Sequence, residues 1–330
     1  MVIHNAKLKR QIYTNEESII MRKVSELREI IFEEKDTPVD TKTIIDFLNL
    51  RGTTHNHGYF HYTTVKSLLS MIKSQKFHLS AGSEMNDLLE TQKGSHERWK
   101  KLYISSFSFG SNENMAMWGI YGDPLNEALR LKFSCANLNK VIKSAQKSQQ
   151  IYCACFNPEN LTYSYEEIKT AFTIKLVDVI YYTKSSVEYD KKKIYLKKYP
   201  DVKNCTSNSD FTGYLKNQAW FYENETRIVV EFEKPLRNVS TVAIDFSEAL
   251  QSLFITSSPC NSKENLLNII NNPEKENIPC QLMSKIDFNI EESIHKGYVH
   301  FRKRCNSCTY EQNKRNVLCP YEMRFSNKEK

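Results

Sequence analysis

The chain has 330 residues, of which 40% are hydrophobic, 12% aromatic and 26% charged, and its formal net charge is +7. This composition is typical of a globular protein and excludes a disordered one, and no run approaches the ~20 apolar residues that a membrane-spanning helix requires. The N-terminal segment MVIHNAKLKRQIY has no apolar signal-peptide core and the nine cysteines are scattered, so we expect a cytoplasmic protein with reduced thiols and no membrane partner.

An amphipathic helix is predicted near the N-terminus, at residues 16–34. Its apolar residues recur at helical spacing, at Ile19, Ile20, Val24, Leu27, Ile30 and Ile31. This spacing gives the helix one apolar face, which would pack on the main domain or on a partner protein. With a second short helix and a polar break behind it, residues 1–57 are expected to form a helical N-terminal extension.

The main domain is predicted over residues 58–295. Strands are expected at residues 58–64, 76–80, 101–109, 128–134, 176–183 and 226–233, and helices at 64–75 and within 110–123. Because these strands and helices do not alternate regularly, the pattern indicates an α+β fold. The stretch 136–219 is long and polar, resembles an insertion, and is a candidate for target recognition.

Positive charge gathers in two segments. Residues 296–330, the basic tail, carry nine Lys or Arg against three Glu, a net charge of +6, and residues 191–203 read KKKIYLKKYPDVK. Clustered positive charge suits polyanions such as RNA or DNA. The alternative is a Lys-rich tail that serves only solubility.

Three cysteines in the basic tail raise the question of zinc. Cys305, Cys308 and Cys319 would need His295 or His300 as a fourth ligand. A structural zinc site usually has two tight ligand pairs, and the second pair is missing here. Reduced thiols are therefore the favoured interpretation, and no metal is expected.

Two glutamates one residue apart mark the strongest candidate site, in WFYENETRIVVEF at residues 220–232. Alternate residues of a strand share a face. One face would then carry Phe221, Glu223, Glu225, Arg227 and Val229, while the other turns apolar and would face the core. Paired carboxylates beside aromatic walls fit acid–base or oxocarbenium chemistry, and a solvated strand face is the alternative. On such an open face, neutralising Glu225 is expected to leave stability almost unchanged.

Five motifs occur in a recognisable order: FHYTT, MNDLLE, ISSFS, MWGIYGD and WFYENETRIVV. This order resembles a bacterial family of unknown function with H-Y-T, N-D-x-x-E, S-F-S, M-W-x-x-Y and E-x-E-x-R motifs. It is also similar to the ADP-ribosyltransferase fold. That resemblance implies a mixed-strand core of two small sheets with flanking helices, and NAD as a substrate.

The resemblance also implies roles for the charged residues of the last motif. Glu225 matches the catalytic glutamate, which stabilises the positive charge that develops when the nicotinamide–ribose bond breaks. Glu223 matches the first acid of the pair, which would orient the acceptor. Arg227 would hold either Glu225 or the pyrophosphate of NAD.

The remaining motifs would bind NAD. His61 matches the histidine of the first strand, which would hydrogen-bond a ribose, and Thr63 completes its motif. Either Tyr121 or Tyr62 would stack on nicotinamide. The strand that carries Ser106 and Ser108 would shape the pocket.

The expected function is therefore NAD-dependent ADP-ribosyl transfer by a bacterial toxin from a toxin–antitoxin or phage-defence system. The basic segments favour a nucleic-acid acceptor, RNA before DNA, and an antitoxin or inhibitor protein is an expected partner. Three alternatives stay open: transfer to protein, a non-enzymatic binding module, and a Mg²⁺-dependent nuclease. The nuclease would use Asp87, Glu90, Glu223 and Glu225.

Overall fold

The structure is a computed structural model of the whole chain. It describes residues 26, 41–54, 58–85, 96–110, 113–121, 127–159, 162–182, 187–190, 193–196, 211–260, 263–294, 299–301 and 323–325. The predicted amphipathic helix at 16–34 lies outside these residues, apart from Glu26, and so does most of the basic tail. Among the described residues, no helix is both long and apolar enough to cross a membrane.

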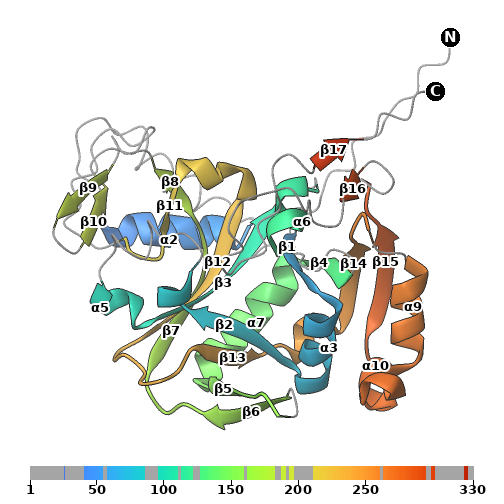
Figure 1. Ribbon diagram of the computed structural model, residues 1–330. Helices are drawn as coiled ribbons and strands as arrows, with labels where there is room; N and C mark the ends of the chain where they lie inside the picture. Colours follow the sequence, from blue (N-terminus) through green and yellow to red (C-terminus); the bar gives the residue numbers. More distant parts are fainter. Residues whose placement is uncertain are drawn as a thin grey trace.

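One large mixed sheet dominates the fold (Figure 1). Its eleven strands are β1 (Tyr59–Thr64), β2 (Lys76–Ala81), β3 (Leu102–Phe109), β4 (Ala128–Phe133), β5 (Tyr152–Asn157), β6 (Thr162–Glu167), β7 (Phe172–Asp178), β12 (Glu225–Phe232), β13 (Thr241–Asp245), β14 (Ser252–Ser257) and β15 (Asp287–Glu292). The order is β15-β14-β4-β1-β3-β2-β13-β5-β6, and β12 and β7 continue from β3. All pairs are antiparallel except β14 with β15. The α+β class is confirmed, but the expectation of two small sheets is wrong, because β3 joins the two halves.

The two halves separate along one edge of β3. That edge pairs with β2 at Tyr103 and Ile104, and with β1 at Ser108 and Phe109. Among the described strands, none pairs with residues 105–107 on this edge, while the other edge pairs with β12 from end to end. The sheet therefore opens locally beside β3, where the backbone edge of residues 105–107 has no paired strand among the described residues.

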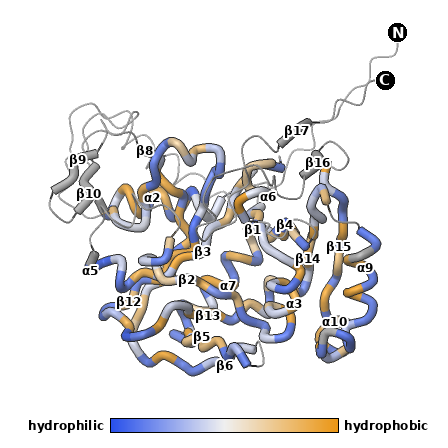
Figure 2. The backbone as a smooth tube through the Cα atoms, in the orientation of Figure 1, coloured by the Kyte–Doolittle hydropathy of each residue, from blue (hydrophilic) through white to orange (hydrophobic). Residues whose placement is uncertain are grey.

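Helices cover the sheet on both faces. They are α2 (Thr41–Gly52), α3 (Val65–Ser74), α5 (His96–Trp99), α6 (Met115–Tyr121), α7 (Cys135–Ser148), α8 (Ser247–Leu250), α9 (Lys263–Asn271) and α10 (Cys280–Met283). The main core joins α3 and α7 to one face of the sheet, and a second core joins α2 to the opposite face. Figure 2 shows that hydrophobic residues follow the central strands, whereas the edge strand β6 is hydrophilic.

Helix α3 illustrates how local sequence builds these elements. Its apolar residues recur every three or four positions and are buried, at Val65, Leu68, Met71 and Ile72. Thr64 caps the first turn, because its hydroxyl accepts a hydrogen bond from the Ser67 amide at 3.2 Å. The helix ends where Gln75 adopts a left-handed conformation, with φ of 54°. The adjoining strand β1 and this helix begin and end close to the predicted boundaries.

The long stretch 136–219 is partly integral to the sheet. It supplies most of α7 and the strands β5, β6 and β7, and β7 pairs with β12 along its whole length. It also supplies two short strands that pair outside the sheet, β8 (Ile180–Tyr182) and β11 (Leu215–Asn217). Further two-stranded pairs are β9 (Val187–Asp190) with β10 (Lys193–Leu196) and β16 (Val299–Phe301) with β17 (Met323–Phe325).

Candidate functional site

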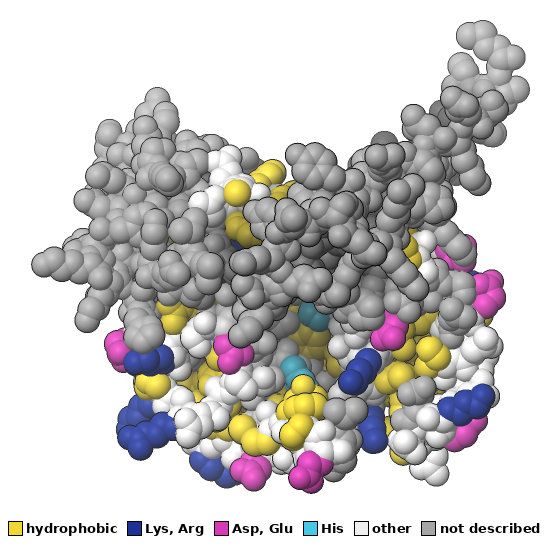
Figure 3. Space-filling view, in the orientation of Figure 1, with side chains coloured by type: hydrophobic (Ala, Val, Ile, Leu, Met, Phe, Trp, Pro, Cys, Tyr) yellow, Lys and Arg dark blue, Asp and Glu magenta, His cyan; other side chains and the backbone are white. Residues whose placement is uncertain are grey.

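A cavity of about 210 Å³ lies at the opening beside β3. Most of the residues nominated from the sequence line it: His61, Tyr62, Ser106, Tyr121, Glu223 and Glu225. They come from β1, β3, α6 and the start of β12, which are far apart in the chain. In the space-filling view, histidine side chains reach the surface near the middle of this face, where it is hollowed (Figure 3).

Glu225 is the most constrained side chain of the cavity. The residue is only 1% exposed, and its carboxylate accepts hydrogen bonds from Arg227 Nε at 2.6 Å and Lys216 Nζ at 2.8 Å. The Ser106 hydroxyl donates a further bond. Two cations and one hydroxyl therefore hold this carboxylate at one position on the cavity wall.

The charge state of Glu225 follows from these contacts. Burial by itself would raise the pKa of Glu225, but the guanidinium of Arg227 and the ammonium of Lys216 outweigh it and lower the pKa to about 2. Glu225 is therefore an anion at neutral pH. The expectation that it lies on an open face is wrong, because β12 is buried on both sides.

Arg227 bonds Glu225 and is not among the described residues that line the cavity. The residue is fully buried, with 0% exposure, and its second guanidinium nitrogen also bonds Glu225 at 3.3 Å. Its Nη1 donates to the Gly213 carbonyl at 2.9 Å. Gly213 has φ of 88°, a conformation that favours glycine, and a Cβ there would lie 2.7 Å from Leu102. Of the two roles proposed for Arg227, the contacts match the one in which it positions Glu225.

Glu223 also bonds Lys216, but it belongs to a different element from Glu225. It ends the short 3-10 helix η3 (Gln218–Glu223), and Asn224 then turns with φ of 45° into β12. The prediction that both glutamates lie on one strand is thus wrong, since the strand begins at Glu225. Both carboxylates nevertheless converge, because Lys216 donates a hydrogen bond to each of them.

The environment of Glu223 differs from that of Glu225. Its residue exposure is 2%, and besides Lys216 it accepts a hydrogen bond from the Tyr121 hydroxyl at 3.2 Å. Burial raises the pKa of Glu223, the ammonium of Lys216 only partly offsets this, and the charge of Glu225 raises it further. The pKa values of the two carboxylates are therefore moved in opposite directions.

His61 lies across the cavity with a defined tautomer. Its Nδ1 is 3.1 Å from the Ser106 carbonyl oxygen, which can only accept a hydrogen bond. Burial lowers the pKa of His61, so the ring is neutral at pH 7 with its proton on Nδ1. Nε2 is left with a lone pair that can accept a hydrogen bond.

The two candidate tyrosines occupy different surroundings. Tyr62 is 6% exposed, packs edge-on against Trp118 at 4.9 Å between ring centres, and its hydroxyl accepts from the Asn114 amide. Tyr121, at the end of α6, is less buried and bonds Glu223. Its ring is therefore the more accessible of the two.

The other nominated residues lie beside the cavity. Thr63 lines a neighbouring groove instead. The Ser108 hydroxyl is 3.5 Å from the Phe60 carbonyl oxygen, and Ser108 is not among the described residues that line the cavity. Of the predicted aromatic walls, Trp220 has Lys216 above its ring at 5.2 Å, while Phe221 is 59% exposed.

Sequence reasoning missed two residues of the site, Lys216 and Tyr181. Lys216 is only 5% exposed although it is a lysine, and the Tyr181 hydroxyl accepts the backbone amide of Glu225 at 2.8 Å. They are paired neighbours on the parallel strands β11 and β8. Lys216 lies between Leu215 and Asn217 in YLKNQAW, a segment that gives no local sign that the lysine is buried.

Other candidates lie outside the described residues, namely Asp87, Glu90, His295, Cys305, Cys308 and Cys319. Within the part of the chain that the structure describes, no group of three or more His, Cys, Asp or Glu is arranged to hold a metal ion.

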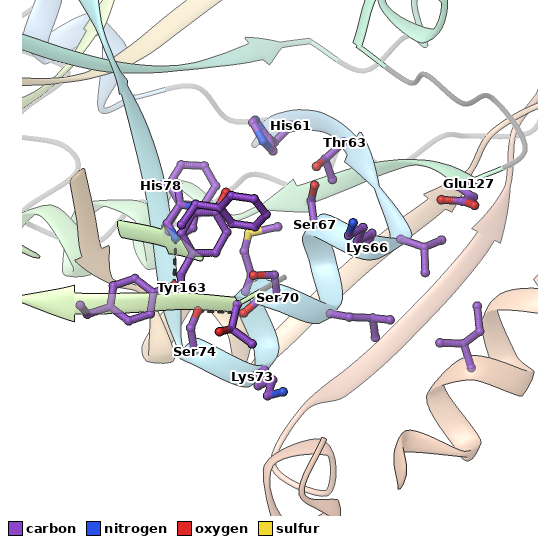
Figure 4. Close-up of a pocket in the computed structure, with 18 of the residues that line it drawn as sticks. His61, Thr63, Lys66, Ser67, Ser70, Lys73, Ser74, His78, Glu127 and Tyr163 are labelled. Carbon is purple, nitrogen blue, oxygen red and sulfur yellow. Dashed lines mark hydrogen bonds between the residues drawn. The ribbon is translucent and has the colours of Figure 1, made fainter. Parts of the chain in front are cut away.

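A larger groove of about 1310 Å³ adjoins the cavity. It runs between α3 and the β5–β6 hairpin, and His61 lines both hollows. Figure 4 shows His61 and Thr63 at one end of the groove and Lys73 and Ser74 of α3 toward the other. The groove and the cavity therefore meet at His61.

Comparison with known proteins gives one match. Residues 117–228 match the family described as "Protein of unknown function (DUF2971)". This range contains the M-W-x-x-Y and E-x-E-x-R motifs and ends within β12, and it supports the expected resemblance to a family of unknown function. No curated protein and no solved structure matches the chain.

Proposed function

We propose that the protein is a NAD-dependent ADP-ribosyltransferase. The observation that carries this proposal is the pair of buried carboxylates on one cavity wall, with a low pKa for Glu225 and a raised pKa for Glu223. Pairs of acids whose environments separate their pKa values are typical of sites that combine electrostatic stabilisation with proton transfer. ADP-ribosyl transfer uses both, because charge on the sugar is stabilised as nicotinamide leaves and the acceptor loses a proton as it bonds to the ribose.

The first role belongs to Glu225. When the bond between nicotinamide nitrogen and ribose carbon breaks, the electron pair leaves with nicotinamide and positive charge develops on the sugar. A fixed anion that cannot be protonated at neutral pH stabilises that charge without reorganisation. Arg227 is not among the described residues that line the cavity, whereas Glu225 lines it with Lys216 beside it, so the Glu225 carboxylate would face the sugar.

The second role belongs to Glu223. A nucleophilic oxygen or nitrogen of the acceptor forms the new bond to the same ribose carbon, and its proton has to leave. A carboxylate with a raised pKa is a better base for that proton than Glu225 is. Lys216 bonds both carboxylates, which reduces their mutual repulsion and keeps them side by side.

The cavity matches one end of NAD. At about 210 Å³, it is smaller than the ~300–1,000 Å³ of sites that enclose a drug-sized ligand, so it has room for the nicotinamide riboside end only. Nε2 of His61 would accept a hydrogen bond from a ribose hydroxyl, and the ring of Tyr121 would stack on nicotinamide.

The acceptor is proposed to be nucleic acid, RNA before DNA, because the chain carries a net charge of +7 with two clustered basic segments. Modification of cellular nucleic acid would make the protein a toxin, held in check by an antitoxin or inhibitor protein. Transfer to a protein acceptor is the alternative within the same chemistry.

A magnesium-dependent nuclease is less well supported by the described residues. A metal ion at Glu225 would have to compete with Lys216 and Arg227 for the carboxylate oxygens. A binding module without activity would bind its ligand in the same cavity and release no nicotinamide from NAD.

The decisive experiment incubates the purified protein with NAD labelled in the adenine ring and with cell lysate. Release of nicotinamide and transfer of label to the RNA, DNA or protein fraction are the two readouts, and Mg²⁺ with RNA but without NAD tests the nuclease. Glu225→Gln is expected to lower nicotinamide release by about 10²–10³-fold. Glu231→Gln, on the same strand but paired with Arg98 near the surface, is the matched control. Wild-type release of nicotinamide by Glu225→Gln would refute the proposed role.

A further inference from the structure

The proposed NAD-cleaving site uses only the small cavity and assigns no ligand to the larger groove beside α3. Its volume of about 1310 Å³ exceeds the ~300–1,000 Å³ of small-molecule pockets. It extends from His61 to the β5–β6 hairpin at the edge of the sheet. A ligand that fills it would be longer than one nucleotide.

One wall of the groove is a row of aromatic rings. Phe156 and Tyr163 face each other across the hairpin with ring centres 5.1 Å apart, and Tyr163 lies 4.5 Å from the ring of His78. Phe156 keeps 50% of its surface exposed. Rings that remain open in this way add little to the core and present faces on which other rings can stack.

Hydrogen bonding fixes this row. The Tyr165 hydroxyl lies 2.9 Å from Nε2 of His78, and the ring of Tyr165 stacks 6.5 Å from that of Tyr163. Burial lowers the pKa of His78, so its ring is uncharged at neutral pH. The wall is therefore a preorganised set of neutral rings, and a ligand does not have to immobilise it.

The opposite wall is the outer face of α3, which carries cations and hydroxyls (Figure 4). Lys66 and Lys73 are exposed and lie two helical turns apart, about 10 Å along the axis at 1.5 Å per residue. Ser67, Ser70 and Ser74 line the groove between and beside them. Among the described residues that line the groove, Glu127 is the only carboxylate.

We infer that this groove binds single-stranded nucleic acid. Rings on one wall and lysines on the other match the two parts of a strand, because bases stack on aromatic faces while phosphates attract cations. A duplex is excluded from this mode, since its bases are already stacked on each other. A strand in the groove would reach His61, where the NAD-cleaving cavity opens, so the groove would present the acceptor for transfer. Only this last step rests on the proposed function.

The binding test uses the full-length protein and a fluorescently labelled single-stranded RNA of about 12 nucleotides, with the DNA of the same sequence and the RNA duplex alongside. Phe156→Ala is expected to weaken single-strand binding about 5- to 150-fold, the effect of losing one stacked base. Phe254→Ala is the matched control, because Phe254 is 45% exposed on β14 and has Lys132 nearby at 5.9 Å, but lies outside the groove. It is expected to bind as the wild type does.

A charge test uses two lysines in equivalent positions. Lys73 and Lys147 each lie in the last turn of their helix, α3 and α7, and only Lys73 lines the groove. Lys73→Gln is expected to lower the slope of log affinity against log salt by about 0.7 for a single strand, while Lys147→Gln leaves it unchanged.

Each outcome decides the inference. A wild-type protein that releases nicotinamide but binds no single-stranded RNA or DNA would overturn the groove assignment and leave the proposed function standing. If single-strand binding depends on Phe156 but the protein does not cleave NAD, the groove assignment stands and the proposed function is overturned. If Phe156→Ala raises the KM for NAD and leaves strand binding intact, the groove holds the nucleotide half of NAD and the inference is wrong.

Discussion

Replacing Glu225 with glutamine should destabilise the protein as well as impair it. The substitution keeps the size of the side chain but removes a negative charge from a cluster with Arg227 and Lys216, whose exposures are 0% and 5%. Two buried cations then lose a carboxylate that they share. Removing one partner of a buried ion pair is strongly destabilising because it leaves a charge without compensation.

Two estimates of the magnitude agree. The pKa of Glu225 falls from an ordinary value of 4.5 to about 2 in the folded protein, which corresponds to about 3 kcal/mol of stability at pH 7. Mutational experience with buried pairs gives about 3–5 kcal/mol for losing one partner. Because the folded pKa is lowered, this contribution is complete above the unfolded pKa and disappears as the pH falls toward 2. Near pH 3 it should be about half as large.

The assay is urea unfolding followed by circular dichroism, at pH 7 and at the lowest pH where both proteins remain folded. The difference in unfolding free energy between wild type and Glu225→Gln should shrink as the pH falls. Glu231→Gln is the control, because its partner Arg98 and Glu231 itself are 17% and 32% exposed, and such a pair contributes at most about 1 kcal/mol. Equal stability of wild type and Glu225→Gln at pH 7 would refute the buried ionic cluster.

Three further predictions concern the proposed chemistry. Lys216→Met should raise the pKa of both carboxylates, because the cation that they share is lost. The rising limb of the pH–rate profile for nicotinamide release should therefore move to higher pH. A profile that does not move would show that Lys216 does not set these pKa values. Tyr121→Phe removes the hydrogen bond to Glu223 and should slow transfer to the acceptor more than NAD hydrolysis. Tyr121→Ala also removes the ring and should in addition raise the KM for NAD. If the two variants have equal effects on transfer, hydrolysis and KM, the ring and the hydroxyl of Tyr121 have no separate roles. Truncation from residue 301 onward removes most of the basic tail and should weaken target modification and its salt dependence while NAD hydrolysis continues. A folded truncated protein that modifies its target normally at every salt concentration would show that the tail is dispensable.

The family match covers only part of the cavity. Residues 117–228 contain Tyr121, Glu223, Glu225 and Arg227, but they exclude His61 and the serines of β3. The cavity is therefore lined both by residues inside the range that matches the family and by residues outside it. Variants of His61 and Glu225 examined side by side would show whether both parts act in one reaction.

Local patterns in the sequence were enough to identify several elements and most of the cavity residues. The apolar spacing of α3, the aromatic-rich segments of β1 and β3 and the apolar run of β12 are each local features of the sequence, and the structure places these elements close to their predicted limits. The two acids Glu223 and Glu225 beside aromatic residues were also visible in the sequence, although only Glu225 belongs to the strand.

Tertiary structure alone decided how those residues work together. Lys216 joins the two carboxylates because β11 pairs in parallel with β8 beside the start of β12, and no periodicity in the sequence encodes that contact. The same is true of the single sheet, since one edge of β3 pairs with β1 at one end and with β2 at the other, and so joins the two parts of the sheet. The local sequence determines which faces are apolar, whereas burial and pairing between distant segments determine the charge of Glu225, the tautomer of His61 and the groove that meets them.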